Sequence, residues 1–551
     1  MSESQQKERG YLHGAAILAT AVAIVKLLGA LYRIPLGNIL GADGFSTFTV
    51  AHSIYAFLLV LSTAGLPVAL SKLIATADAL GRPRQVRQIF VIGRNAFFAL
   101  GVICFLIMAV FHQQLANLSN SPTSAYAILA LSPAILFVCL LAVYRGYFQG
   151  FSNMVPTSVS QVIEAAIRLI LGLGFAWFFM YYFDSVAITV AGAILGVTIG
   201  TGIAALYMFL VRRKWEHRHI SKQNELDTPD SNRRIFKNLL NFAIPLSLGA
   251  SILSIVAIID NAIILGRLQD VFQSVRGYDY ATAYDTARNL HGTYAFTMTL
   301  FNLPSSFIIP ITVALIPAIS ATLARGETPL ARKTSESGIR VTCLLALPAG
   351  AGLVVLAAPI MHVLFGEVAA EGQWLMIYMG IAAFFICFFQ VTNCILQAYG
   401  HQRYTVYTLT VGGIVKIALN WVLLGNPNIH IYGAAISTLA CYAVISAMNI
   451  YLVKRNIPDP PKFMRVLARP LICTAAMGAA AWATHGLLAS LVSAVMPNLH
   501  ERIRITAVTF GAIGIAMIVY LILIIAMRAL TMEDMKMLPR GEKLAKILKI
   551  R

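Results

Sequence analysis

Long blocks of apolar residues alternate with short polar stretches from residue 12 to residue 527. Each block reaches the ~20 residues that an α-helix needs to cross a bilayer. The pattern predicts an all-α polytopic membrane protein with about 14 transmembrane helices. The expected spans are residues 12–36, 45–71, 88–111, 123–144, 158–182, 187–211, 235–265, 290–324, 337–362, 373–398, 404–425, 431–453, 466–494 and 503–527.

The composition excludes a soluble domain. The chain of 551 residues is 58% hydrophobic and only 12% charged, whereas soluble proteins carry about 25% charged residues. All seven cysteines lie inside apolar blocks, without the spacing of a metal site. They are therefore interpreted as small buried hydrophobic residues, and neither a metal nor a cofactor is expected.

The net charge of +19 is explained by topology. Most of the 42 Lys and Arg residues lie in the loops on the side of the membrane that carries both termini. Because cytoplasmic loops are rich in Lys and Arg, both termini are expected in the cytoplasm. Basic stretches such as 212–214 and the tail 543–551 then indicate contact with membrane lipids, and no nucleic acid is expected as a partner.

The two halves of the chain resemble each other. Gln149 precedes the fifth expected span and Gln397 the eleventh, and the same interval relates Arg168 to Lys416. Each half therefore places a cation at the same depth of the corresponding helix, which predicts two parallel six-helix repeats. The expected domains are an N-lobe at 1–213, a basic cytoplasmic linker at 214–234, a C-lobe at 235–455, and spans 13 and 14 with a basic tail at 456–551.

Ionisable residues inside two N-lobe spans form stripes. Lys26 and Arg33 are seven residues apart in the first span, and Glu164 and Arg168 are four apart in the fifth, so each pair shares a helix face. Such residues are costly in a membrane and usually face the interior. Glu164 and Arg168 can also pair with each other, and Arg33 can reach toward the membrane surface.

Further polar residues lie in the second half. Asp260 lies in the seventh span, and Lys416 and Asn420 are four residues apart in the eleventh. Across both halves the interior cations outnumber the interior acids, which favours a cavity that attracts an anion. Ion pairs that only join helices are the structural alternative for each of these residues.

Several motifs resemble the MurJ/SpoVB-type lipid flippases of the multidrug/oligosaccharidyl-lipid/polysaccharide exporter superfamily. The resemblance runs through nearly the whole chain and rests on Lys26–Leu36, Leu40–Gly44, Gly65–Lys72, Arg145–Gly150, Pro156–Arg168, Leu303–Pro304 and Leu315–Ser320.

The resemblance implies a fourteen-helix, two-lobed fold in a bacterial plasma membrane. It implies flipping of an undecaprenyl-diphosphate-linked saccharide, most plausibly the peptidoglycan precursor lipid II, to the outer leaflet. In such flippases span 1 arginines line the cavity, and Lys26 and Arg33 match them best here. The family's cavity arginine of span 8 is replaced by Thr299, so Arg288 or His291, just before that span, are the candidate substitutes.

Other functions stay open. The cargo can instead be a teichoic-acid or capsule precursor. A drug/cation antiporter of the same superfamily needs a more acidic cavity. A membrane glycosyltransferase or ligase needs a catalytic loop, and the longest outer loop expected, 266–289, shows no paired-carboxylate site. The chain is therefore expected not to be an enzyme. It has no Walker A motif, so coupling to a monovalent cation, a proton or the membrane potential is the hypothesis.

Overall fold

The computed structural model describes residues 3–183, 185–219, 230–366, 369–496 and 500–530, and every regular element in these ranges is a helix. This confirms the expected all-α class. The chain divides into two compact units, Met1–Gly266 with Tyr284–Gly292, and Arg267–Ala283 with Thr293–Arg551. Residues 220–229 of the expected linker, 214–234, lie outside the described residues, while one helix continues to His219 and the next begins at Asn232.

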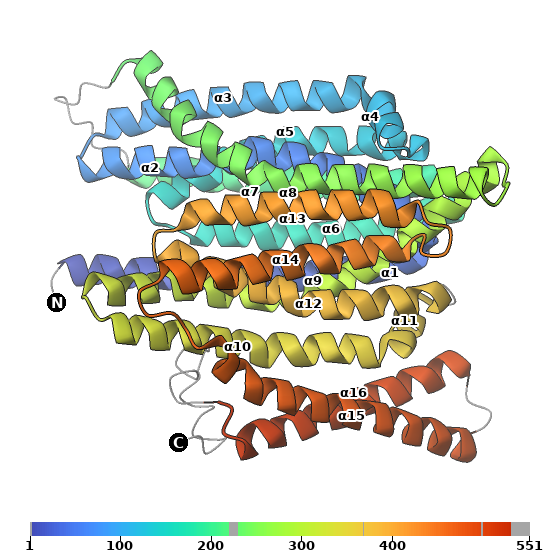
Figure 1. Cartoon of the computed structure of the whole chain (residues 1–551). Helices are drawn as coiled ribbons and strands as arrows, with labels where there is room; N and C mark the ends of the chain where they lie inside the picture. The colour runs from blue at the N-terminus through green and yellow to red at the C-terminus, as the bar shows by residue number, and fades with distance from the viewer. Residues whose placement is uncertain (1–2, 184, 220–229, 367–368, 497–499, 531–551) are drawn as a thin grey trace. The chain divides into compact units, whose positions relative to one another are not determined.

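Unit 1 contains most of the N-terminal helices (Figure 1). They are α1 (Glu3–Thr63), α2 (Leu66–Ala79), α3 (Pro83–Val110), α4 (His112–Leu118), the 3₁₀ helix η1 (Pro122–Ser124), α5 (Ala125–Gly150), α6 (Val155–Tyr182) and α7 (Val186–His219). Unit 1 also takes the larger part of α8 (Asn232–Ser274) and a short segment of α9 (Tyr280–Ala324).

Unit 2 contains the rest of α8 and α9 and all the later helices. They are α10 (Thr328–Val355), α11 (Ala357–Phe365), α12 (Ala369–Ala398), α13 (Gln402–Leu424), α14 (Tyr432–Asn456), α15 (Phe463–Val495) and α16 (Glu501–Ala526). The last two helices pack on each other, and α15 also packs on α10 and α16 on α11.

Two interruptions shape the first helices. α1 bends at Gly41, whose φ of 67° is a left-handed conformation that glycine adopts without a steric cost. The helix then ends at Thr63, and α2 starts at Leu66 with Pro67 in its first turn, where the missing N–H costs nothing. The expected spans 12–36 and 45–71 are therefore one bent helix followed by a second short one.

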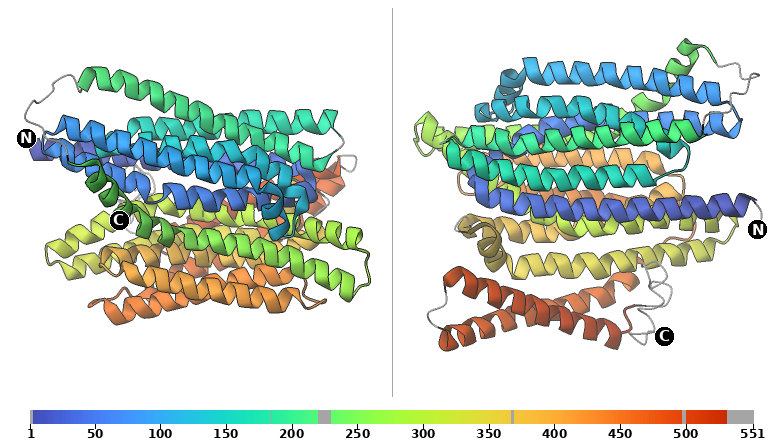
Figure 2. Two further views of the ribbon diagram at one scale, coloured as in Figure 1. Left: turned by 90° about the horizontal axis from the view of Figure 1, so that it is seen from above. Right: turned by 180° about the vertical axis from the view of Figure 1, so that it is seen from behind.

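The expected repeat appears as a shared pattern of neighbours. In unit 1, α5 packs on α3 and α7, and α6 packs on α7. In unit 2, α12 packs on α10 and α14, and α13 packs on α14. Within unit 1 these helices run side by side along a common direction (Figures 1 and 2). This supports two pseudo-repeated bundles with α15 and α16 as an addition.

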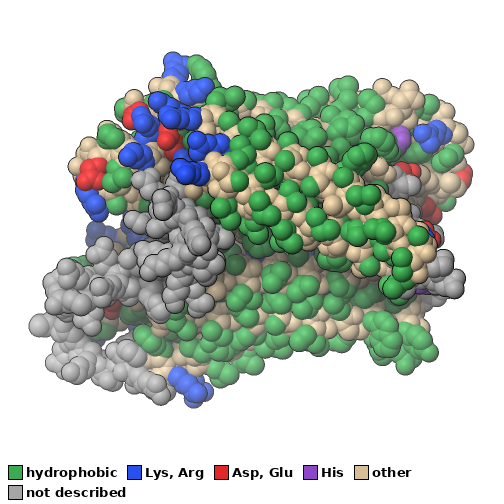
Figure 3. Space-filling view, turned by 90° about the horizontal axis from the view of Figure 1, so that it is seen from below, with side chains coloured by type: hydrophobic (Ala, Val, Ile, Leu, Met, Phe, Trp, Pro, Cys, Tyr) green, Lys and Arg blue, Asp and Glu red, His purple; other side chains and the backbone are tan. Residues whose placement is uncertain are grey.

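Among the described residues, 13 stretches are long and apolar enough to cross a membrane. The first, Thr20–Ala79, has 60 residues and covers the second expected span together with residues 20–36 of the first. On the face drawn in Figure 3, hydrophobic side chains cover most of the middle, while most of the visible Lys and Arg side chains lie toward the left edge. The seven cysteines are all buried and free, as interpreted from the sequence.

One expected loop is wrong. The stretch 266–289 is helical as far as Ser274 and again from Tyr280. Asp279 ends the short connection by capping α9, since its carboxylate accepts hydrogen bonds from the backbone N–H groups of Ala281 and Thr282. Apolar blocks predict only the part of a helix inside the bilayer, so these extensions were missed.

Candidate functional site

Three cations of unit 1 lie together where α6 packs on α1. Lys26 and Arg33 belong to the part of α1 before its bend, and Arg168 belongs to α6. Arg33 and Arg168 both act electrostatically on Lys26, and the guanidinium carbon of Arg168 is 6.0 Å from the centre of the Tyr32 ring. Lys26 is exposed, while Arg33 and Arg168 are half-buried. The predicted cations of spans 1 and 5 are therefore brought together as one group, here called the cation cluster.

The cation cluster has no acidic partner within the part of the chain that the structure describes. None of its three members forms an ion pair there, and the buried Nε of Arg168 has no hydrogen-bond acceptor. Tyr32 holds one side of the cluster and donates its hydroxyl to the Ala193 carbonyl at 3.3 Å. Because charged groups inside a membrane need a counter-charge or water, this cluster can receive an anion.

Glu164 does not pair with Arg168. Its Oε2 lies 3.0 Å from Nη2 of Arg145, and Nε of Arg145 donates to Ser160 at 3.0 Å. The spacing in the sequence suggests that Glu164 pairs with Arg168 on α6, but the carboxylate pairs instead with Arg145 from the last turns of α5. The expected fourth span ends at residue 144, so the sequence does not place Arg145 among the cations inside the membrane. Because Glu164 pairs with Arg145, it does not neutralise the positive charge of Arg168.

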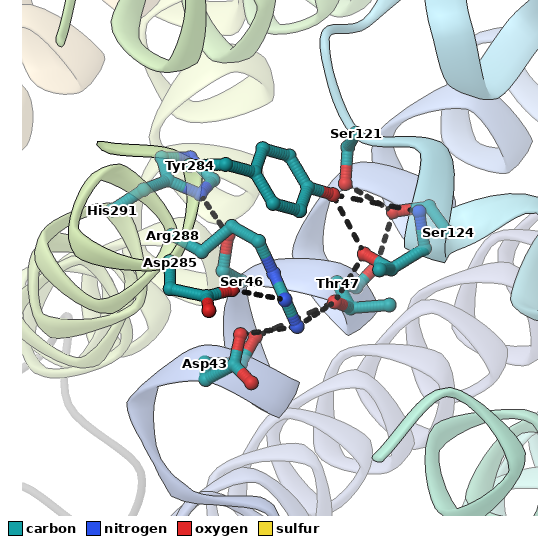
Figure 4. Close-up of polar contacts among 10 residues, drawn as sticks. Asp43, Ser46, Thr47, Ser121, Ser124, Tyr284, Asp285, Arg288 and His291 are labelled. Carbon is teal, nitrogen blue, oxygen red and sulfur yellow. Dashed lines mark hydrogen bonds and ion pairs between the residues drawn. The ribbon is translucent and has the colours of Figure 1, made fainter. Parts of the chain in front are cut away.

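Arg288 lies in a second polar group, formed by α1 just after its bend and by the segment 284–292 of α9 (Figure 4). Its side chain is only 7% exposed and forms ion pairs with Asp43 and Asp285. Nη2 of Arg288 also donates to Thr47. The sequence suggested Arg288 as a cation for the substrate, but the two acids already neutralise its charge.

His291 extends this group through a chain of buried polar side chains. Its Nδ1 is 2.8 Å from the hydroxyl of Ser46, and its Nε2 is 3.1 Å from Oδ1 of Asn261. Asn261 donates its amide N–H to Ser53 at 3.0 Å. A neutral ring with its proton on Nε2 satisfies every one of these groups. The chain ties α8 and α9 to α1, and we call it, with the Arg288 ion pairs, the polar latch.

Close backbone packing accompanies the polar latch. A Cβ added to Gly292 would lie 1.6 Å from the carbonyl oxygen of Ala42. Only glycine therefore allows α9 to approach the bend of α1 this closely. The neighbouring Tyr284 adds a hydrogen bond of 3.0 Å to Thr123 (Figure 4). Asp43 and Gly292 were not singled out from the sequence, because their partners are far away along the chain.

The remaining predicted residues are buried. Asp260 of unit 1 is 4% exposed. In unit 2, Lys416 is 8% exposed and Asn420 is fully buried on α13, where Asn420 accepts a hydrogen bond from Ser437 of α14. Asp260, Lys416 and Asn420 stay candidate substrate residues.

Comparison with protein families supports a transporter. The family described as "Polysaccharide biosynthesis protein" matches residues 11–323, and the MatE family matches residues 292–422. Among solved structures, "Lipid II flippase MurJ, inward closed conformation" is 14% identical with a TM-score of 0.65, covering 92% of this chain and 98% of that one. An inward-facing multidrug resistance MATE transporter of the MOP superfamily is 14% identical with a TM-score of 0.64, covering 80% and 98%.

Relatives in Bacillus subtilis (strain 168) align over almost the whole chain. Stage V sporulation protein B is 24% identical, with 96% of this chain and 98% of the relative covered. The protein named "Lipid II flippase MurJ" is 24% identical, with 92% and 94% covered. The chain therefore belongs to the polysaccharide biosynthesis protein family of the MOP transporter superfamily, and it is a multi-pass membrane transporter and not an enzyme.

Proposed function

We propose that this protein flips an undecaprenyl-diphosphate-linked saccharide, most plausibly lipid II, from the inner to the outer leaflet of a bacterial plasma membrane. The single observation that carries the proposal is the cation cluster of Lys26, Arg33 and Arg168, none of which forms an ion pair among the described residues. The names of the relatives, which include a lipid II flippase, point to the same class of cargo.

The physical problem for such a cargo is its diphosphate. A charged group cannot enter hydrocarbon unaided, because losing its hydration is very costly. Each charge-assisted hydrogen bond from a Lys or Arg recovers about 1.5–3 kcal/mol. Three cations can therefore hold the diphosphate while the prenyl chain stays in the lipid. Alternating access between two repeated bundles would then move the head group across.

The saccharide itself is a separate question, since teichoic-acid, capsule and peptidoglycan precursors share the prenyl diphosphate that the cations would bind. Lys416, Asn420, Asp260 and Glu164 are candidates for contacts with the sugar or with a coupling monovalent cation or proton. We expect both termini in the cytoplasm, as the distribution of Lys and Arg indicates.

A multidrug antiporter is the second candidate, because residues 292–422 match the MatE family. Such a protein binds cationic drugs, and cations would be repelled by Lys26, Arg33 and Arg168. An acidic group that is open to the substrate would be needed, but Glu164 is already paired with Arg145.

The test is reconstitution into liposomes with fluorescent lipid II and a leaflet-accessibility assay. We expect Lys26→Ala and Arg33→Ala each to slow flipping by about 10- to 100-fold, since one lost contact of about 1.5–3 kcal/mol corresponds to that factor. Arg94→Ala, which removes an exposed cation of α3, is the matched control and should flip normally. Full activity in both Lys26→Ala and Arg33→Ala, or transport of a cationic dye instead of lipid II, would overturn the proposal.

A further inference from the structure

Unit 2 contains a pocket at one end of its C-terminal helix pair. The pocket has a volume of about 410 Å³ and is formed by α11, α12, α15 and α16. It lies near the end of α15 and the start of α16, so it is at the level where a membrane helix leaves the bilayer. Under the expected orientation this is the outer face. The pocket is distant in sequence from the cation cluster and belongs to the other unit.

The pocket is lined by polar side chains that can bind an anion. The set comprises His362 of α11, Gln373 of α12, His485 and Ser493 of α15, and Arg504 of α16. Of the residues that the structure describes, no Asp or Glu lines it. A guanidinium, two imidazoles and an amide are the groups that proteins use to bind phosphate oxygens.

Two of these groups have no partner among the described residues. Nε2 of His485 is buried without any hydrogen bond, and no acceptor is found for the guanidinium of Arg504. A buried polar atom without a partner costs about 1–3 kcal/mol. A bound anion that accepts a hydrogen bond from Nε2 of His485 would remove this cost, and it would also give the half-buried Arg504 a counter-charge. The neighbouring Arg502 is used differently, since it donates to the Val363 carbonyl at 3.3 Å and ties α16 to α11.

The surroundings of the pocket face lipid. Trp482 of α15 and Ile515 of α16 lie seven residues from the lining residues Ala489 and Val508, on the same helix faces, and are 74% and 38% exposed. In a membrane protein such side chains contact acyl chains. A phosphate bound in the pocket could therefore remain attached to chains that lie along α15 and α16. The volume is also larger than a phosphate ion needs and is within the range of small-ligand sites.

We infer that this pocket binds the phosphate of an anionic membrane lipid, with the lipid's chains on the outside of α15 and α16. The same side chains could bind free inorganic phosphate, but only a lipid also has acyl chains that can contact the helices. The exposed apolar side chains on the pocket-side faces of α15 and α16 favour the lipid. Through this site, α15 and α16 would make the transporter sensitive to the lipid composition of its membrane.

Native mass spectrometry of the full-length purified protein tests this inference. We expect phosphatidylglycerol adducts to persist where phosphatidylcholine adducts are lost, and Arg504→Gln to weaken phosphatidylglycerol binding about tenfold. Arg504→Lys should keep part of the binding, and His485→Gln should weaken it less than Arg504→Gln. Arg465→Gln, which removes an exposed cation at the opposite end of α15, is the control of equal charge and should change binding less than twofold.

Each outcome decides the inference once the variants show the elution profile and melting temperature of the wild type. Equal phosphatidylglycerol binding by Arg504→Gln and Arg465→Gln would overturn it, as would equal retention of the two lipids. Displacement of the lipid by millimolar inorganic phosphate would identify a free-anion site instead. Lys26→Ala should lose flipping but keep its phosphatidylglycerol adducts, so a failure of the proposed function is separable from a failure here.

Discussion

The polar latch makes a quantitative prediction about Arg288. Removing one partner of a fully buried ion pair costs about 3–5 kcal/mol, because the other charge is left without compensation. Arg288 is 7% exposed but Asp43 is 36% exposed, so water screens part of that charge. We therefore expect Arg288→Gln to lower the free energy of unfolding by about 2–3 kcal/mol.

The acids of the latch supply the controls. Asp285 is 71% exposed, so Asp285→Asn should cost at most about 1 kcal/mol, as surface pairs do. Adding Asp43→Asn to Arg288→Gln removes the orphaned carboxylate, and the double variant should recover about 1 kcal/mol. Unfolding by SDS in mixed micelles, followed by circular dichroism, measures these differences. Equal stability of Arg288→Gln and Asp285→Asn, or a double variant less stable than Arg288→Gln, would refute the role of the latch.

Two further predictions concern the packing and the charge of unit 1. Gly292→Ala should destabilise the protein by more than the few tenths of a kcal/mol that are typical of surface changes. The reason is that the new Cβ would overlap the backbone carbonyl oxygen of Ala42, which cannot rotate away. A melting temperature equal to that of the wild type would contradict this packing. Arg145→Gln should slow lipid II flipping, because the released Glu164 can then neutralise Arg168 four residues further along α6. Arg145→Gln with Glu164→Gln should restore flipping in the liposome assay, and a double variant as slow as the single one would disprove this explanation.

The sequence was sufficient to predict the helical class, since each apolar block is a pattern within one segment. It also predicted that Lys26 and Arg33 share a face of one helix. The bend at Gly41 was not foreseen, because a left-handed glycine can end a helix as well as bend one. The expected loop between the first two spans is therefore helical on both sides of that residue.

Side-chain partners from distant segments could not be predicted. The ion pair of Arg288 with Asp43 joins segments from opposite halves of the chain. Glu164 illustrates the same limit, because Arg168 four residues away was the apparent partner and Arg145 on α5 is the actual one. The spacing along one helix predicts which side chains of that helix are close enough to pair. Whether they pair depends on the side chains that a second helix brings to the same place.

The predicted repeat pairs positions that differ in chemistry between the two halves. Gly172 and Asn420, each four residues after the cation of its half, occupy equivalent positions. A Cβ at Gly172 would lie 2.7 Å from the Tyr32 ring, so this glycine leaves room for Tyr32 to pack beside Arg168. In unit 2 the larger Asn420 fills its position and accepts a hydrogen bond from Ser437. The space that Gly172 leaves for Tyr32 on α6 is thus filled on α13 by a hydrogen-bonded amide, so the side chain four residues after the cation has a different role in each half.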